Sequence, residues 1–283
     1  MLTRRRGILY VAGALALTAP PGIWLLSSYP NSPLSVIAPV RPRAVDARVP
    51  ALLPVQLAQQ DPMALVRLGR QRYAETVREY RCVLVKQERL GNEFTPVQEI
   101  EVRFREAPRA VYMLWLRNAD QAKRALWMDD ASFVDKKGRR TARVEPAGAI
   151  ARLFVSDLYV PIDGPEAKRS SRRSIDECGF AATFRLLETY NAIAAERGVL
   201  DLRYDGVGEV DGRPTYVITR DLPYEDANGP YPDARMVLHL DQEWLLPVAV
   251  YSYADHTETK LLGSYVFTKV ELNPRFADDA FSF

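Results

Sequence analysis

The chain has 283 residues, of which 47% are hydrophobic and 26% are charged, and its formal net charge is +2. This composition is that of a globular protein with a sizeable core, and it lacks the strongly basic balance of a nucleic-acid-binding protein. With two cysteines and two histidines there are too few ligands for a zinc cluster, so the sequence predicts neither a metal site nor a cofactor.

Residues 1–27 have the pattern of a targeting segment. Arg4-Arg5-Arg6 precede an uncharged, mostly apolar run that is about long enough to span a bilayer. The segment is either an uncleaved signal-anchor or a signal peptide cleaved after a small residue such as Ala19, although Pro20 is unfavourable at that point. We therefore expect the protein in the cell envelope, anchored in the inner membrane and facing the periplasm, or periplasmic if the segment is cleaved.

Residues 28–60 are rich in proline, small residues and scattered arginine. Proline prevents regular helix and disfavours sheet, so this segment is predicted to be an extended, disordered tether. The prolines are Pro30, Pro33, Pro39, Pro42, Pro50 and Pro54. The tether either holds a domain away from the membrane or is a leader without a function of its own, and the sequence leaves both open.

Residues 61–283 are predicted to form a single domain that opens with a helix. Asp61 is a suitable N-cap, Pro62 suits the first helical position, and apolar residues recur at helical spacing up to about Glu79. Strand patterns then follow with short connections, which favour antiparallel neighbours. The predicted strands lie at residues 80–88, 124–128, 132–134 and 139–144, with two more inside residues 97–116.

The clearest strand pattern lies in residues 97–116. Apolar residues over 100–104 alternate with charges, so the first strand has one apolar face and one wet face. The second strand is apolar on both faces, with Met113 and Trp115 on one and Tyr112 on the other. Such a pair suits the wall of a large antiparallel half-barrel.

Between residues 146 and 179 the strand rhythm stops. Phe180, Phe184 and Leu187 then mark a second amphipathic helix that ends at Gly198, a suitable residue just after a helix. A loop and a helix inserted between two runs of strands are a natural lid for an open sheet. The alternative, which stays open here, is that the helix simply fills the core.

The strand pattern resumes after this helix. Asp211-Gly212 is the strongest short hairpin signal in the chain. Strands are predicted at residues 199–210, 213–220, 234–240, 244–253 and 260–272. With about ten or eleven strands and two main helices, the predicted fold is mainly β (α+β), an unclosed antiparallel half-barrel with a helical lid.

Three motifs resemble a known family. They are YRCVLVKQERLGN, REAPRAVYMLW and SSRRSIDECGF, and they are similar to an uncharacterised bacterial envelope family catalogued as domain of unknown function 1571. The C-terminal residues from LHLDQEWLLPVAVYSY onward are similar in architecture to the LolA-like superfamily. That superfamily includes periplasmic lipoprotein carriers and regulators of RseB type, so the resemblance implies a LolA-like half-barrel over residues 61–283.

No catalytic pattern is present. His239 lies in an apolar strand, and His256 lies in a polar turn beside Asp255, which we interpret as a solvated turn. Nucleophile-elbow, zinc-protease and nucleotide-binding motifs are lacking. The sequence therefore predicts a protein that is not an enzyme.

Cys82 and Cys178 are far apart in the sequence. In an oxidising compartment they could form a disulfide that joins the lid to the sheet. Both also have apolar neighbours, as buried free thiols do, and the sequence leaves the two alternatives open.

Aromatic and sulfur-containing side chains supply the ligand hypothesis. If one face of the sheet is incompletely covered, strand residues would line an apolar groove, with Phe180, Phe184 and Leu187 contributed by the lid. The candidate groove residues are Phe104, Tyr112, Met113, Trp115, Trp127, Trp244, Tyr265 and Phe267. An ordinary packed core would use the same residues.

The predicted function is a non-enzymatic, periplasm-facing binding protein of the cell envelope for lipid or the acyl moiety of a lipoprotein. Its expected partners are a lipid or lipidated protein and, through the N-terminal segment, the inner membrane. The alternative is a regulatory module of RseB type that docks onto another envelope protein. A deep apolar cavity would favour the first, and a filled core with an exposed patch would favour the second.

Overall fold

The computed structural model describes residues 52–148 and 158–283, all of which fall within one compact unit. The predicted targeting segment at residues 1–27, and the predicted tether up to residue 51, lie outside the described residues.

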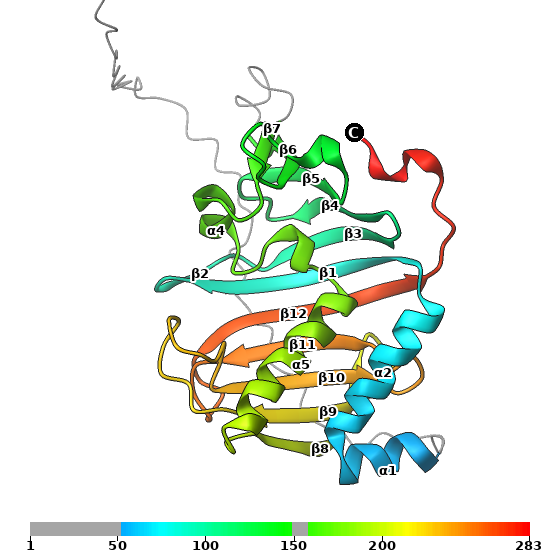
Figure 1. The fold of residues 1–283 in the computed structure, drawn as a ribbon, viewed down its shortest axis with the longest axis vertical. Helices are drawn as coiled ribbons and strands as arrows, with labels where there is room; N and C mark the ends of the chain where they lie inside the picture. The colour runs from blue at the N-terminus through cyan, green and yellow to red at the C-terminus, as the bar shows by residue number, and fades with distance from the viewer. Residues whose placement is uncertain (1–51, 149–157) are drawn as a thin grey trace, which may run out of the picture. The chain divides into compact units, whose positions relative to one another are not determined.

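The described residues form one 12-stranded antiparallel sheet (Figure 1). Its strand order is β7-β6-β5-β4-β3-β1-β12-β11-β10-β9-β8, and the short β2 pairs with β1. The strands are β1 (Glu79–Leu90), β2 (Glu93–Phe94), β3 (Gln98–Glu106), β4 (Arg109–Arg117), β5 (Ala122–Met128), β6 (Thr141–Pro146), β7 (Leu158–Pro161), β8 (Asp201–Val210), β9 (Arg213–Asp221), β10 (Arg235–Asp241), β11 (Pro247–Tyr253) and β12 (Leu261–Leu272).

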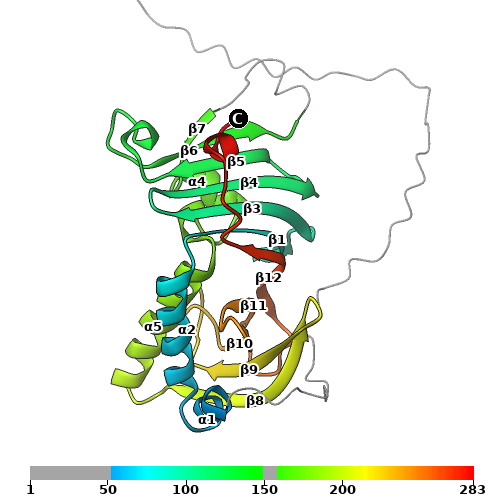
Figure 2. The ribbon, with the colours of Figure 1, turned by 90° about the vertical axis from the view of Figure 1, so that its right-hand side faces the viewer.

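The helices lie mainly on one face of this sheet, as two views at right angles show (Figures 1 and 2). The α-helices are α1 (Leu52–Gln60), α2 (Pro62–Thr76), α4 (Pro165–Ser170) and α5 (Phe180–Glu196), and the 3-10 helices are η1 (Ala131–Phe133), η2 (Ile175–Glu177) and η3 (Asp278–Phe281). Helices α2 and α5 pack against each other and over the strands β8 to β11. The expected fold class is confirmed, because the sheet is antiparallel and its end strands β7 and β8 do not pair with each other.

Two meanders build the sheet. Strands β3 to β7 follow one another on one side, β8 to β12 follow one another on the other side, and β1 pairs with both β3 and β12. The Asp211-Gly212 hairpin signal is confirmed: both residues have positive φ, 53° and 74°, as a tight hairpin turn with a right-handed twist requires.

Aromatic rings fill the centre of the core beneath the helices. The ring of Tyr80 in β1 stacks on Phe104 of β3 at a centroid distance of 4.9 Å. The ring of Phe180, at the start of α5, lies 4.7 Å from Tyr80 and 4.9 Å from Phe267 of β12. The first turn of α5 is thereby held over the β1–β12 seam.

Three local predictions differ from the structure. Leu52–Gln60, predicted as the end of the tether, form α1, because Pro54 lies in the first helical turn, where its missing N–H costs no hydrogen bond. Residues 132–134 are not a strand: Asp130 accepts a hydrogen bond from the Ser132 N–H and caps η1. The segment predicted as loop before α5 contains β7, α4 and η2.

The C-terminal residues cross the face of the sheet that lies away from the helices (Figure 2). Phe281 is 6% exposed and packs with Tyr112 and Leu126 in a second apolar cluster. The guanidinium groups of Arg124 and Arg143 lie 4.7 and 4.8 Å from the ring centroid of Phe283, close enough for cation–π attraction. This segment covers apolar side chains of β4 and β5 that would otherwise face water.

Candidate functional site

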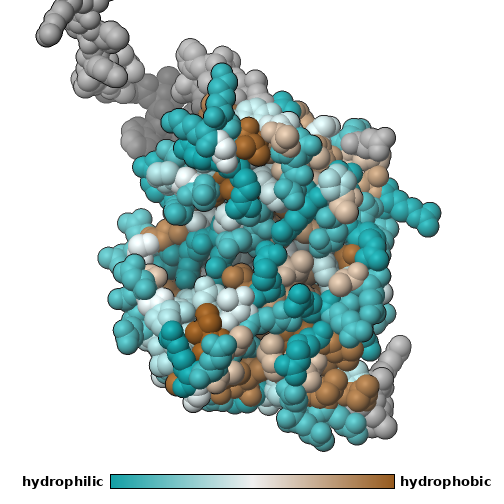
Figure 3. All heavy atoms as spheres, in the orientation of Figure 1, coloured by the Kyte–Doolittle hydropathy of each residue, from teal (hydrophilic) through white to brown (hydrophobic). Residues whose placement is uncertain are grey.

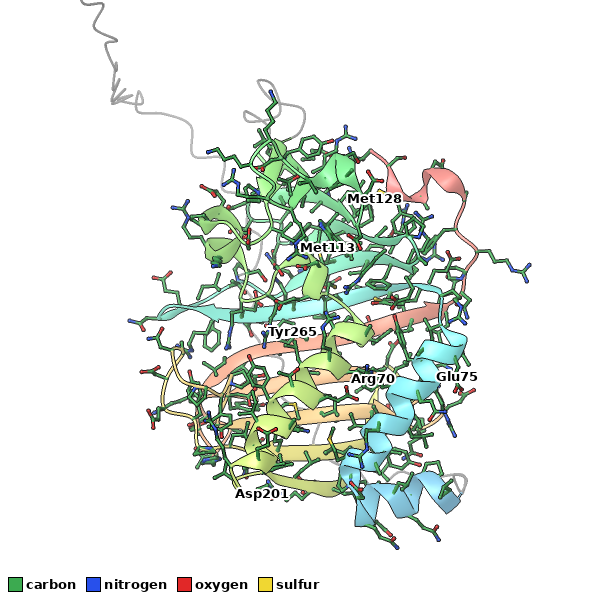
Figure 4. All side chains as sticks on the ribbon, viewed as in Figure 1. Arg70, Glu75, Met113, Met128, Asp201 and Tyr265 are labelled. Carbon is green, nitrogen blue, oxygen red and sulfur yellow. The ribbon has the colours of Figure 1, made fainter. Side chains whose placement is uncertain are left out.

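The alternation of side chains along each strand decides which residues face the helices. In β1 the even-numbered residues, among them Leu84 and Lys86, point to the helix side, and in β4 the odd-numbered Met113 and Trp115 do so. Met113 and Tyr265, labelled in Figure 4, come from β4 and β12, on the two sides of β1. Both sheet halves therefore contribute to one concave face.

A cavity of about 400 Å³ lies between this concave face and a lid made of α4, η2 and α5. This volume is in the range, roughly 300–1,000 Å³, that is usual for small-molecule sites. Its wall is mostly apolar. The apolar lining residues include Leu84, Ile100, Met113, Trp115, Ala125, Ala142, Val144, Val160, Ile162, Ile175, Leu186, Leu187, Met236, Val250 and Phe267.

The surface on the lid side is mostly hydrophilic (Figure 3). Hydrophobic residues on this face gather over α1 and the adjoining end of α2, where Leu53 is 61% exposed. The rest of this face is dominated by polar residues, with smaller hydrophobic groups between them (Figure 3).

The helix α5 was expected either to be a lid over the open sheet or to fill the core. It does both: its first turns fill the core, and its next turn lines the cavity. Phe180 and Phe184 are fully buried among the aromatic rings of the core. Leu187, one turn further along α5, lines the cavity. The predicted lid residues thus divide by their position along the helix.

Gly179 sets the start of this helix. Its φ is +100°, and a Cβ at this position would lie 1.9 Å from the hydroxyl oxygen of Tyr80. The N-terminus of α5 can therefore approach Tyr80 only because residue 179 has no side chain.

We expect Gly179→Ala to lower the free energy of unfolding by about 3 kcal/mol, because it adds backbone strain and a clash with the buried Tyr80 ring. Chemical denaturation followed by circular dichroism measures the loss. Gly91→Ala is the control: that glycine also has positive φ, but nothing lies within 4 Å of its Cβ position, so we expect a loss of about 1 kcal/mol. Equal losses in the two variants would contradict the proposed contact.

Four of the eight predicted groove residues line the cavity: Met113, Trp115, Tyr265 and Phe267. Phe104 and Trp127 are on the same side of the sheet but lie in the packed core. Trp244 lies apart, with the guanidinium carbon of Arg213 3.5 Å from its ring centroid. Tyr112 does not face the cavity: it points to the opposite face, under the C-terminal residues.

Sequence reasoning missed the polar part of the lining. Lys86, Gln98, Ser171, Arg173 and Arg220 all line the cavity. The alternation of side chains along the strands could have identified two of them. Lys86 comes two residues after Leu84 in β1, and Gln98 comes two residues before Ile100 in β3, so each shares the apolar face of its strand. The others come from loops or from a strand whose neighbours are not evident from the sequence.

A buried carboxylate organises this polar part. Glu88 of β1 is fully buried and accepts hydrogen bonds from the Lys86 ammonium at 3.0 Å, the Tyr265 hydroxyl at 2.7 Å and the Ser171 hydroxyl at 3.3 Å. The backbone N–H of Arg172 also donates to it at 3.3 Å. Burial alone would raise the pKa of Glu88, but the Lys86 charge and these hydrogen bonds outweigh burial and hold the pKa below its usual value.

Gly263 makes this arrangement possible. It pairs with Glu88 across the β1–β12 ladder, and a Cβ there would lie 3.0 Å from the Tyr265 hydroxyl. The absence of a side chain lets the Tyr265 ring cross to the Glu88 carboxylate. The sheet is thereby joined to the loop between α4 and η2 through Ser171 and Arg172.

Both cysteines are free thiols, which is the second of the two alternatives that the sequence left open. Cys178 lines the cavity and Cys82 lies in the core. Burial raises the pKa of the Cys178 thiol to about 12 and that of Cys82 well above its usual value, which favours the protonated form of both thiols.

Neither histidine belongs to the cavity. His239 is fully buried in β10, with Nδ1 3.0 Å from the hydroxyl of Thr215. His256 lies in an exposed turn, with Nδ1 3.5 Å from a carboxylate oxygen of Asp221. Over residues 52–148 and 158–283, no group of three or more Asp, Glu, His and Cys side chains is placed to hold a metal ion, and no helix is both long and apolar enough to cross a membrane.

The chain resembles solved structures at low identity. It is 20% identical to MucB over 80% of this chain and 64% of that one, with a TM-score of 0.46, so it spans less than two thirds of MucB. It is 14% identical to the Mycobacterium tuberculosis lipoprotein LppX over 77% of this chain and 99% of that one, with a TM-score of 0.41. A putative outer membrane lipoprotein-sorting protein domain from Vibrio parahaemolyticus is 9% identical over 77% and 95%, with a TM-score of 0.36.

No curated protein matches the chain. The model of one protein family does match, over residues 77–283, from the start of β1 to the C-terminus and including every strand and the whole lid. The three motifs that suggested the resemblance lie inside this range. The chain belongs to the family described as protein of unknown function DUF1571.

Proposed function

We propose that the protein is a non-enzymatic binding protein of the cell envelope that holds the acyl chain of a lipid or of a lipidated protein. The observation that carries this proposal is the apolar cavity between the sheet and the lid. Its lining of Leu, Ile, Val, Met and Trp side chains offers dispersion contacts and no polar partner over most of its surface, which suits a hydrocarbon chain.

The cavity volume fits one chain. A methylene group takes up no more space than a water molecule in the liquid, roughly 30 Å³, so about 400 Å³ corresponds to about a dozen chain carbons. Both Trp115 and Met113 line this space, and Trp115 is half-buried whereas Met113 is 9% exposed. We expect the chain to enter past Trp115.

The location in the envelope rests on the targeting pattern of residues 1–27. A retained anchor would hold the cavity near the inner membrane, which contains the proposed ligands. A cleaved signal would release the same domain into the periplasm.

We expect Trp115→Glu to weaken binding of dodecyl amphiphiles by more than tenfold, because it places a carboxylate where the chain would lie. The measurement is isothermal titration calorimetry of the full chain with dodecanoate and with dodecyl maltoside, both below their micelle concentrations. Leu116→Glu is the matched control, since Leu116 is the next residue of β4 and is 50% exposed. We expect the control to bind as the unchanged protein does.

If the unchanged protein binds none of these amphiphiles, the proposal is wrong. The alternative of an interaction module of RseB type would then be favoured. That alternative has one supporting feature, the filled core under α2, where Leu65 and Val66 are fully buried in the main apolar cluster.

A further inference from the structure

The cavity has a polar end where several cationic side chains lie close to its lining. The cross-strand row Gln98–Lys86–Tyr265 marks this end, and the loop between α4 and η2 covers it. Three cations lie in this region: Lys86 in β1, and Arg172 and Arg173 in the covering loop. Glu88 is the carboxylate that pairs with Lys86.

The two arginines of the covering loop are incompletely paired. Nη2 of Arg172 contacts the carbonyl of Pro232 at 3.4 Å, and its Nη1 is buried without a partner in the described part of the chain. Arg173 lines the cavity, and its guanidinium has no hydrogen bond or ion pair with any described residue. A guanidinium group left unpaired beside a cavity retains strong hydrogen-bonding capacity for an anion.

Both guanidinium groups act on the same phenol. Burial and the neighbouring Glu88 carboxylate raise the pKa of Tyr265, and the positive charges of Arg172 and Arg173 oppose this effect. The geometry places the loop backbone beside the same group: the Tyr265 hydroxyl donates to Glu88 at 2.7 Å, and the backbone N–H of Arg172 donates to that carboxylate at 3.3 Å.

Three of the four described carboxylates that line the cavity have partners of their own. Asp233 pairs with Arg220 at 2.8 Å, Glu166 pairs with Arg169 at 3.4 Å, and Glu177 accepts the backbone N–H of Ser174 at 3.3 Å. The fourth, Asp120, lies in the connection between β4 and β5, the same connection whose Asn118 carbonyl accepts a hydrogen bond from the Gln98 side chain at 3.3 Å. None of them forms an ion pair with Arg172 or Arg173 within the described ranges.

We propose that this end of the cavity binds the anionic group of a single-chain amphiphile, a carboxylate or a phosphate, whose hydrocarbon chain lies against Trp115 and Leu187. Arg173 contacts the anionic group through its guanidinium, and Lys86 completes the positive surface beside it. This inference rests on the proposed function and adds the chemistry of the headgroup to it.

Four ligands with the same dodecyl chain test the inference by calorimetry on the full chain. They are dodecanoate, dodecyl phosphate, dodecyl maltoside and dodecyltrimethylammonium, each below its micelle concentration. We expect the two anions to bind on the order of tenfold more tightly than the maltoside, and the cation to bind most weakly. Inorganic phosphate alone is expected to show no measurable binding at these concentrations.

Arg173→Gln is expected to lower the affinity for both anions about tenfold and to leave the affinity for dodecyl maltoside unchanged. Arg173→Lys keeps the charge and is expected to retain most of the affinity. Arg169→Gln is the matched control, because it removes the same charge from neighbouring α4 at a side chain that is 71% exposed. Thermal denaturation of each variant confirms that the fold is kept, as expected for an arginine without a side-chain partner among the described residues.

The outcomes separate the two proposals. Equal binding of all four amphiphiles would leave the acyl-chain proposal intact and overturn the headgroup proposal. The headgroup proposal would also be overturned if inorganic phosphate bound as tightly as dodecyl phosphate. The same holds if Arg169→Gln lowered the affinity for the anions as much as Arg173→Gln does. Binding of none of the four would overturn the proposed function itself.

Discussion

Replacing Asp233 with asparagine is expected to lower the free energy of unfolding by about 3–5 kcal/mol, because it leaves the Arg220 guanidinium buried without its counter-charge. Arg220 of β9 is 2% exposed and Asp233 is 3% exposed, with Nη2 and Oδ1 2.8 Å apart. Arg220 Nη1 also donates to the side chain of Asn191 in α5, at 3.1 Å. The pair therefore joins the sheet, the lid helix and the loop before β10.

Urea denaturation of the unchanged protein, of Asp233→Asn and of two comparison variants measures this loss. Glu271→Gln breaks the exposed Arg81–Glu271 pair between β1 and β12, whose side chains are 51% and 48% exposed, and we expect it to cost less than about 1 kcal/mol. The double change Arg220→Met with Asp233→Leu removes both charges and should recover most of the loss. Similar losses for Asp233→Asn and Glu271→Gln would contradict the role assigned to the buried pair.

The second large effect depends on pH. Burial lowers the pKa of His239 to about 4, from an ordinary value of 6.5. The unfolded chain therefore binds a proton at this residue as the pH falls through 6.5, whereas the folded protein does so only near pH 4. Stability from the neutral His239 is present above pH 6.5 and is lost between pH 6.5 and 4, by about 3 kcal/mol in total.

The packing around His239 explains the shift. Thr215 is the hydrogen-bond partner of Nδ1, Nε2 has no partner among the described residues, and the Tyr251 ring lies 5.9 Å away. Gly208 lets β8 approach closely, since a Cβ there would lie 3.0 Å from the imidazole. No carboxylate in the described part of the chain is paired with the ring, so none there offsets the cost of placing a charge on it.

The test compares the pH dependence of unfolding in His239→Gln and His256→Gln. The first variant should lose the part of the slope that lies between pH 6.5 and 4. The second should keep it, because His256 is in an exposed turn. A slope that survives in His239→Gln would mean that other groups cause the acid sensitivity.

Much of the fold could be predicted because successive side chains of a strand point to opposite faces of the sheet, and this alternation is visible in the sequence. Alternation over residues 97–116 identified β3 and β4, and Asp211-Gly212 fixed the β8–β9 hairpin. Elements that depend on contacts with distant residues were missed. Short helices such as α4 and η2 have few residues of their own to signal them, and η2 is placed by Asp176, which binds Arg140 at 2.7 Å from far along the chain.

The site was harder to predict than the fold. The pattern of β4 shows that Tyr112 and Met113 point to opposite faces, but it does not show which face the helices cover. That is decided by the C-terminal residues, which pack on Tyr112, and by α5, which packs above the other face. Arg173 was missed for another reason, because its place in the cavity lining depends on the path of a loop rather than on a periodic pattern.

The pairing of β1 with β12 has a consequence for how the chain folds. These strands are neighbours at the centre of the sheet, yet in the sequence β1 is the first strand of the domain and β12 is the last one described. The two meanders can form from neighbouring segments, whereas the seam requires closure of a loop that contains almost the whole domain, which slows folding. During synthesis, Leu84 and Phe267 cannot meet until β12 has left the ribosome, so the apolar wall of the cavity stays exposed until the last strand arrives.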